Sequence, residues 1–95
     1  MSALLIGLMT VRNTNWQEEY QREIPALIKK HGGRLVAASP PERFEGSQLP
    51  DRLVILEFPD LESARRWYSD PPHAPLIELR QSGASFDLFG LEVKG

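Results

Sequence analysis

The sequence of 95 residues contains no cysteine and only two histidines. Without cysteine the chain has no disulfide, no thiolate nucleophile and no thiolate metal ligand. A transition-metal site would need carboxylate ligands, and no acidic residues are spaced for one. Phosphate-binding glycine loops and serine-nucleophile motifs are missing as well. The sequence therefore predicts no metal site and no tightly bound cofactor.

The sequence also lacks a large excess of charge of either sign. The net charge is −2, and the lysines and arginines are scattered along the chain. Proteins that bind nucleic acid or anionic lipid carry a clustered basic surface, so neither partner is predicted. The apolar start, residues 1–9, is too short to cross a bilayer and lacks the basic flank of a signal peptide. We therefore expect a cytoplasmic protein.

The composition that is present, 41% hydrophobic and 25% charged, is typical of a globular protein. We expect one domain spanning residues 1–95. A domain of this size buries only about 60–65% of the surface that its unfolded chain exposes. Its core is therefore expected to be thin.

Four segments have the residue pattern of strands. Ala3–Val11 and Arg52–Phe58 are nearly continuous apolar runs, which is typical of strands buried on both faces. Arg34–Ser39 is short and Ser85–Val93 carries charges, as expected for edge strands. The proline-rich connection of residues 40–51 cannot form a central strand.

The first predicted helix lies between the first two strands. Asn15 is expected to cap it, with Glu18 completing a capping box, and the glycines at residues 32–33 are expected to end it with positive φ angles. Pro25 lies inside this helix, where proline removes a backbone hydrogen bond and clashes with the preceding turn. The cost of about 3 kcal/mol predicts a kink or a split helix. His31 is interpreted as a cation at the helix C-terminus rather than as a metal ligand.

Two further helices are predicted before the last strand. Asp60 is expected to cap the second, and the prolines at residues 71–72 to end it. The third is expected over about Ala74–Gln81, ended by Gly83. The second-helix side chains predicted to face the core are Leu61, Ala64, Trp67 and Tyr68.

The order strand–helix–strand–strand–helix–strand predicts an α+β, ferredoxin-like fold with an extra short helix. In the four-stranded antiparallel sheet of that fold, the first and third strands are central and both main helices cover one face. The uncovered face would expose several large apolar side chains, worth on the order of 10 kcal/mol at roughly 2 kcal/mol each. A second copy is expected to cover that face. The alternative is a monomer in which residues 40–51 cover it.

Three stretches of the chain resemble the DUF1330 family: "YQREIPALIKKHGGRLVA", "FEG" and "RLVILEFPDLESARRWYSDPP" with the later "LIELR". The resemblance covers nearly the whole chain. It implies a homodimer of the dimeric α/β-barrel kind, in which two sheets form one barrel. The chain departs from the usual family pattern at residues 70–73 and 37–39, where the mouth of a pocket is expected.

His73 is the predicted catalytic residue. It precedes a helix in a proline-rich turn, and the ordinary pKa of histidine allows proton transfer near neutrality. Beside Trp67 and Tyr68 it is predicted to shuttle a proton to a flat aromatic ligand. The alternatives are a histidine that caps a surface turn and a tryptophan that belongs to the core.

Arg80 is predicted to bind a carboxylate or enolate oxygen of the ligand through its planar guanidinium. The alternative is a structural ion pair with Asp87 or Glu57. Glu57 shares the sheet face of Leu53 and Ile55. It is predicted either to enter the same half-buried site with a raised pKa or to end the strand in solvent.

Two classes of function follow from these residues. The first is a small cofactor-independent enzyme that performs proton transfer or oxygenation on a small aromatic or oxygen-bearing molecule. The resemblance implies isomerases, quinone-forming monooxygenases or haem-degrading enzymes, although the first strand lacks the asparagine of the last kind. The second class is a non-catalytic binding protein or a purely structural dimer. An enclosed cavity lined by His73, Arg80 and an aromatic residue favours an enzyme, and a filled core favours the alternative.

Overall fold

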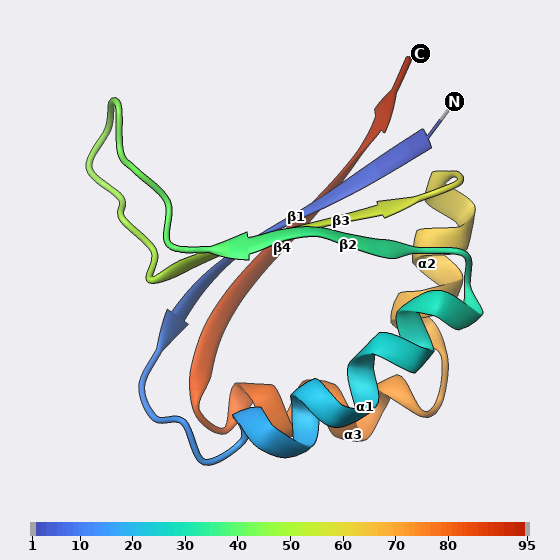
Figure 1. The fold of residues 1–95 in the computed structure, drawn as a ribbon, viewed down its shortest axis with the longest axis horizontal. Coiled ribbons are helices and arrows are strands. Elements are labelled where there is room, and N and C mark those ends of the chain that lie inside the picture. The colour runs from blue at the N-terminus through green and yellow to red at the C-terminus, as the bar shows by residue number, and fades with distance from the viewer. Residues whose placement is uncertain (1, 95) are drawn as a thin grey trace.

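The computed structural model describes residues 2–94 (Figure 1). The elements follow in the order β1 (Ser2–Val11), α1 (Gln17–Lys30), β2 (Arg34–Ser39), β3 (Arg52–Phe58), α2 (Leu61–Ser69), α3 (His73–Gln81) and β4 (Ala84–Val93). The strands form one antiparallel sheet in the order β2-β3-β1-β4. This confirms the predicted α+β, ferredoxin-like arrangement, with the two most apolar strands in the centre. Within residues 2–94, no helix combines the length and the apolar content that crossing a membrane requires.

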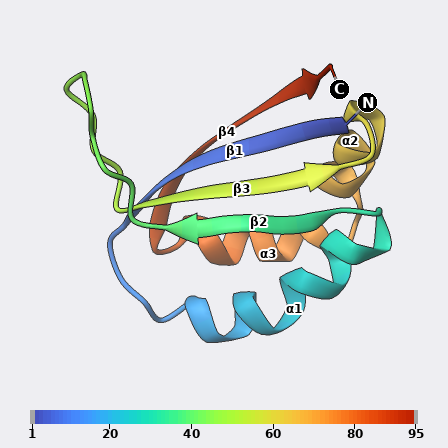
Figure 2. The same ribbon diagram turned by 45° about the horizontal axis from the view of Figure 1, so that its top comes forward.

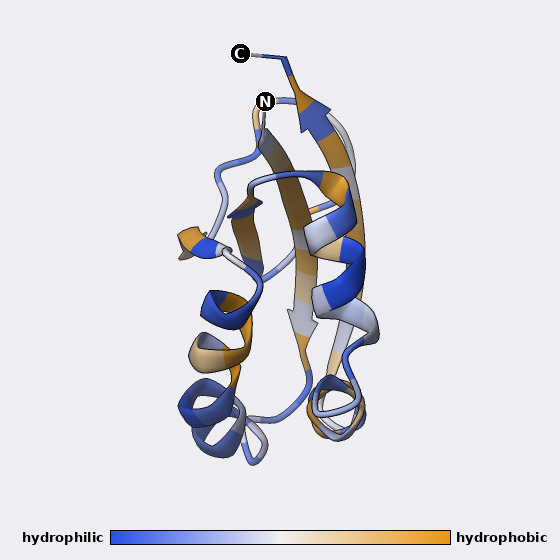
Figure 3. Cartoon of the chain, turned by 90° about the vertical axis from the view of Figure 1, so that its right-hand side faces the viewer, coloured by the Kyte–Doolittle hydropathy of each residue, from blue (hydrophilic) through white to orange (hydrophobic). Residues whose placement is uncertain are grey.

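The helices cover one face of the sheet (Figure 2). Every second residue of β1 from Ala3 to Met9 is buried, because these positions point toward the helices. Strand residues and helix residues meet in one apolar cluster, and the strands are hydrophobic along most of their length (Figure 3). The buried members of that cluster are Leu5, Ile24, Leu27, Ile28, Leu56, Phe58, Ala64, Trp67 and Leu76.

The opposite face of the sheet is also apolar. The register pairs Leu4 with Leu91 and Ile6 with both Phe89 and Ile55, so these side chains share one face. We call this surface the open face; its leucine, isoleucine and phenylalanine members are Leu4, Ile6, Leu8, Leu53, Ile55, Phe89 and Leu91. Phe89 is 60% exposed and Leu91 is 44% exposed, which shows that no element of residues 2–94 covers their side of the sheet.

The loop of residues 40–51 does not cover the open face. It extends past the end of the sheet and turns away from the helices (Figures 1 and 2). Phe44 in this loop is 88% exposed and Leu49 is 58% exposed. The alternative in which this loop covers the open face is therefore wrong.

The start of α1 differs from the prediction. The helix begins at Gln17, no side chain caps it, and the backbone N–H of Asn15 donates to Asn13 Oδ1 at 3.3 Å. The predicted capping box of Asn15 and Glu18 is therefore wrong. Trp16 is buried and its Nε1 donates to the carbonyl of Asn13 at 2.7 Å, so packing of the indole sets the start of the helix.

The helix α1 is unbroken from Gln17 to Lys30, so the predicted split at Pro25 is wrong. Ile24 and Leu27 are buried on either side of Pro25, and this packing compensates for the lost backbone hydrogen bond. Of the two glycines that follow, Gly32 alone has a positive φ, 79°. Gly33 is required for a different reason, because a Cβ there would lie 2.5 Å from the Phe58 ring.

Candidate functional site

A cavity of about 630 Å³, which is open to solvent rather than enclosed, lies between α2, α3 and the helix-facing side of β1 and β4. Two cationic side chains, Arg65 and Arg80, line it, and no aspartate or glutamate does. Tyr68, Phe86 and Leu88 contribute aromatic and apolar surface. The cavity is therefore apolar and carries positive charge, which favours a ligand that is largely hydrophobic and anionic.

Arg80 is the buried charge of this cavity. It is 3% exposed, and its Nη1 donates to the hydroxyl oxygen of Tyr20 at 3.1 Å. The guanidinium carbon lies 4.4 Å from the centre of the Phe86 ring. Its Nε has no hydrogen-bond partner. Within residues 2–94, no carboxylate oxygen lies within 4.0 Å of its guanidinium nitrogens. The alternative of an ion pair with Asp87 or Glu57 is therefore wrong.

A buried arginine without a carboxylate partner is unusual. Burying a guanidinium charge without a counter-ion is costly. Stacking on Phe86 offsets part of that cost. Gly7 makes this stacking geometry available, because a Cβ at Gly7 would clash with the Phe86 ring. The buried residues of α3 are His73, Leu76 and Arg80. They lie on one face of the helix, which explains why the arginine points inward.

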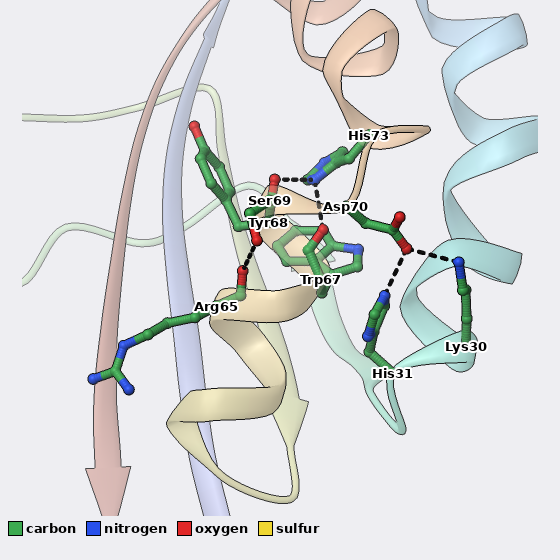
Figure 4. Close-up of polar contacts among 8 residues, drawn as sticks. All are labelled: Lys30, His31, Arg65, Trp67, Tyr68, Ser69, Asp70 and His73. Carbon is green, nitrogen blue, oxygen red and sulfur yellow. Dashed lines mark hydrogen bonds and ion pairs between the residues drawn. The ribbon is translucent and has the colours of Figure 1, made fainter.

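Tyr68 and Arg65 form the α2 side of the cavity. They are three residues apart on the helix and therefore lie on one face of it. Tyr68 is 46% exposed, so its predicted place in the core is wrong, whereas its predicted place at a pocket agrees with the cavity lining. Figure 4 shows both side chains on the side of α2 that faces the strands.

His73 lies behind this wall and is fully buried. Its Nδ1 is 3.2 Å from the carbonyl oxygens of both Trp67 and Tyr68 (Figure 4). Because both partners are acceptors, Nδ1 carries the hydrogen and donates it, so Nε2 is the atom with a free lone pair. Burial lowers the pKa of His73 below its ordinary value, and the imidazole is neutral at pH 7. The structure does not place His73 on the wall of the cavity.

Trp67 and Glu57 also lie away from the cavity. Trp67 is 2% exposed and packs between Phe58 and His73, with ring centres 5.4 and 4.4 Å away, as its core alternative predicts. Glu57 shares the open face with Ile55 and pairs with Arg34 at 2.7 Å. Of the five predicted site residues, the structure brings Tyr68 and Arg80 together at the cavity.

The sequence reasoning missed Arg65, Phe86 and Gly90, which also line the cavity. Spacing could have found Arg65, because it lies three residues from Tyr68 and four from Leu61 on one helix face. No local signal marks Phe86 or Gly90. A Cβ at Gly90 would lie 2.7 Å from a methyl group of Leu5, so the glycine allows close packing beside the cavity.

A polar cluster at the end of α1 is structural. Asp70 Oδ2 accepts from Lys30 Nζ at 2.9 Å and lies 2.8 Å from His31 Nε2 (Figure 4). The hydrogen bonds from Lys30 and then from His31 lower the pKa of the Asp70 carboxyl. This cluster ties the end of α1 to the turn between α2 and α3. Within residues 2–94, no three His, Asp or Glu side chains gather as metal ligands would.

The sequence pattern of one family covers almost the whole chain. The family described as domain of unknown function DUF1330 matches residues 2–93. The chain belongs to the DUF1330 family. None of the proteins with curated functions matches it.

Solved structures share the fold of this DUF1330 chain at low identity. RPA0582 of Rhodopseudomonas palustris, a protein of unknown function, is 17% identical with a TM-score of 0.80, over 99% of this chain and 84% of that one. SnoaB of Streptomyces nogalater, a cofactor-independent oxygenase, is 13% identical with a TM-score of 0.72, over 99% and 94%. A dimeric ferredoxin-like protein of unknown function from Jannaschia sp. CCS1 is 13% identical with a TM-score of 0.73, over 98% and 100%. At these identities the likeness shows the fold alone.

Proposed function

We propose that this protein is a homodimeric, cofactor-independent enzyme that acts on a small aromatic, oxygen-bearing molecule bound in the cavity between α2, α3 and β4. The observation that carries the proposal is the buried, uncompensated charge of Arg80 at the cavity wall. A ligand oxygen with negative charge would supply the missing counter-ion. The fold shared with the cofactor-independent oxygenase SnoaB supports the class of reaction by analogy.

The chemistry that Arg80 offers is charge stabilisation. Removing a proton beside a carbonyl, or from a phenol, leaves an enolate or phenolate oxygen. A guanidinium already fixed at the site stabilises that oxygen without reorganisation, which is the usual source of the largest catalytic effect. Arg65 and Tyr68 lie on the α2 wall, where they would contact the rest of the ligand.

His73 is the proposed proton acceptor. Its Nε2 carries a free lone pair and has no hydrogen-bond partner, so it is chemically able to accept a proton. Its side chain contacts Tyr68, the ring centres being 5.5 Å apart, and Tyr68 lines the cavity. Because His73 does not line the cavity, a direct transfer requires a movement that brings its Nε2 to the cavity wall.

Arg80→Gln tests the proposal directly. A panel of hydroxylated aromatic acids is screened by calorimetry, and we expect the variant to bind the best ligand at least about tenfold more weakly, since a lost charge-assisted contact costs about 1.5–3 kcal/mol. Arg66→Gln is the matched control, because Arg66 is exposed on α2 and lies outside the cavity. Equal affinity in Arg80→Gln and the parent would refute Arg80 as the anion-binding residue.

The second candidate function is a non-catalytic binding protein or a structural dimer. The observation in its favour is that His73 does not line the cavity. His73→Gln separates the two candidates, because glutamine keeps a polar side chain of similar size but cannot accept a proton. Loss of turnover with ligand affinity retained supports the enzyme, and ligand binding without turnover in the parent protein supports the alternative.

The homodimer is proposed to form through the open face. The seven leucine, isoleucine and phenylalanine side chains of the open face would gain on the order of 10 kcal/mol on burial. An isologous twofold contact lets one such surface cover itself. Solved relatives of this fold include dimeric proteins, which supports the proposal.

A further inference from the structure

The loop of residues 40–51, which we call the arm, exposes more apolar side chain than a loop needs. Phe44 is 88% exposed and Leu49 is 58% exposed. The arm extends from the end of the sheet between β2 and β3 and turns away from the helices (Figures 1 and 2). An aromatic side chain presented in this way indicates a contact surface.

The direction of the arm is set by its own sequence. Pro40, Pro41 and Pro50 restrict φ at its two bases. At one base, Asp51 Oδ2 accepts the backbone N–H of Val11 at 2.7 Å, which ties the arm to the end of β1. Gly46 turns the tip with a φ of 103°. The arm is therefore held out from the body of the chain.

The size of the open face indicates what the arm contacts. The four strands of the sheet, β1, β2, β3 and β4, contain 10, 6, 7 and 10 residues. With strands about 4.8 Å apart and about 3.4 Å per residue, the flat area of the sheet is roughly 540 Å². A stable protein–protein interface buries roughly 800 Å² from each partner. A contact made by the arm of each copy would add to the surface that the two open faces bury.

We propose that the arm supplies this contact, with Phe44 packing against the second copy in the dimer that covers both open faces. This inference rests on the homodimer proposed above. In an isologous pair each copy holds the other with its arm, so the contact is made twice. The charged residues of the arm are Glu42, Arg43, Glu45 and Asp51, and their sum is negative, which disfavours an anionic lipid surface as the occupant.

The variant Phe44→Trp tests the inference by fluorescence. The native tryptophans, Trp16 and Trp67, are 3% and 2% exposed, so their emission is that of buried indoles. The new indole is expected to emit as a water-exposed one at low concentration. Its emission should shift to the blue over the concentration range in which sedimentation shows the dimer forming. Emission that stays red-shifted while the protein dimerises would overturn the arm contact but not the sheet dimer.

Two other outcomes are equally decisive. A protein that sediments as a monomer at every concentration would overturn both the dimer and the arm contact. A blue shift that appears on vesicles of phosphatidylcholine and phosphatidylglycerol, but not with rising protein concentration, would overturn the second copy as the occupant.

A matched pair of substitutions measures the strength of the contact. Phe44→Ser is expected to raise the dimer dissociation constant at least tenfold, because both arms lose their anchor. Arg43→Ser changes the adjacent exposed residue and should leave the constant within about threefold. Equal constants for Phe44→Ser and the parent would refute the contact. Because the arm is exposed in the single chain, the melting temperature of dilute Phe44→Ser should stay unchanged.

Discussion

The side chains on the two faces of the sheet are similarly hydrophobic, yet the chain itself covers only one face. Leu56 and Ile55 are neighbours on β3 and point to opposite faces. Leu56 is 4% exposed and belongs to the core cluster with the helices. Ile55 is half-buried on the open face. The difference shows that an apolar strand pattern indicates how much surface is hydrophobic, but not what covers each face.

The largest effect is expected on the covered face. Leu56→Ala should lower the free energy of unfolding by about 2–5 kcal/mol, because it leaves a cavity in the core. Ile55→Ala removes a side chain of the same size from the open face, and in a dilute sample it should cost about 1 kcal/mol. Chemical denaturation at low protein concentration measures both. Equal losses would mean that the two faces are not distinguished within the single chain.

The next effect concerns assembly rather than folding. Ile55→Arg should weaken the proposed dimer at least about 100-fold, because a charge buried without a partner costs about 3–5 kcal/mol. Sedimentation at several concentrations measures the dissociation constant, with Glu23→Arg on the exposed side of α1 as the control. A dimer of unchanged strength in Ile55→Arg would remove the open face as the interface.

The helix layer on the covered face contains the buried His73 of α3, which makes the stability of the chain depend on pH. Burial lowers the pKa of His73, so the unfolded chain binds the proton more readily than the folded one. This destabilising contribution of His73 is absent above the ordinary histidine pKa near 6.5, and the free energy of unfolding falls as the pH drops below that value. The free energy of unfolding between pH 7 and 5 should decrease less in His73→Gln than in the parent. A parent curve flat over this range would contradict the assigned neutral state.

The smallest effect is expected at the polar cluster that joins α1 to the turn after α2. The lowered pKa of Asp70 means that its contribution is complete above the ordinary aspartate pKa of 3.8 and is lost as the pH falls below it. Asp70→Asn should therefore reduce the melting temperature slightly at pH 7 and by less at pH 3. A large loss at pH 7 would show that the cluster contributes more than a surface ion pair.

Much of the fold could be predicted from local patterns in the sequence. The apolar runs of β1 and β3 and the polar dilution of β4 determine which strands are central. The prediction failed where packing overrides local preference. Burial of Trp16 displaces the start of α1 past Asn15, and packing on both sides of Pro25 keeps the helix whole. Propensity is a local quantity, whereas these outcomes depend on contacts between distant residues.

The candidate site was predictable only in part. Arg80 was predicted from the anion-binding chemistry of its planar guanidinium, and Tyr68 from its place in the sequence close to His73. The sequence does not show that Arg80 lacks a carboxylate partner, since Asp87 and Glu57 lie on elements that could have approached it. The structure separates them: Glu57 pairs with Arg34 on the open face, and the Arg80 guanidinium stacks on Phe86.

The sequence by itself determined the order of the elements, the central strands and the existence of more apolar surface than two helices cover. These properties follow from the spacing of side chains along the chain, which periodicity expresses directly. The tertiary structure alone decided that Arg80 is buried without a counter-ion beside a cavity, and that the arm leaves Phe44 in solvent. Both depend on which distant groups meet in space, and the spacing of residues along a chain does not contain that information.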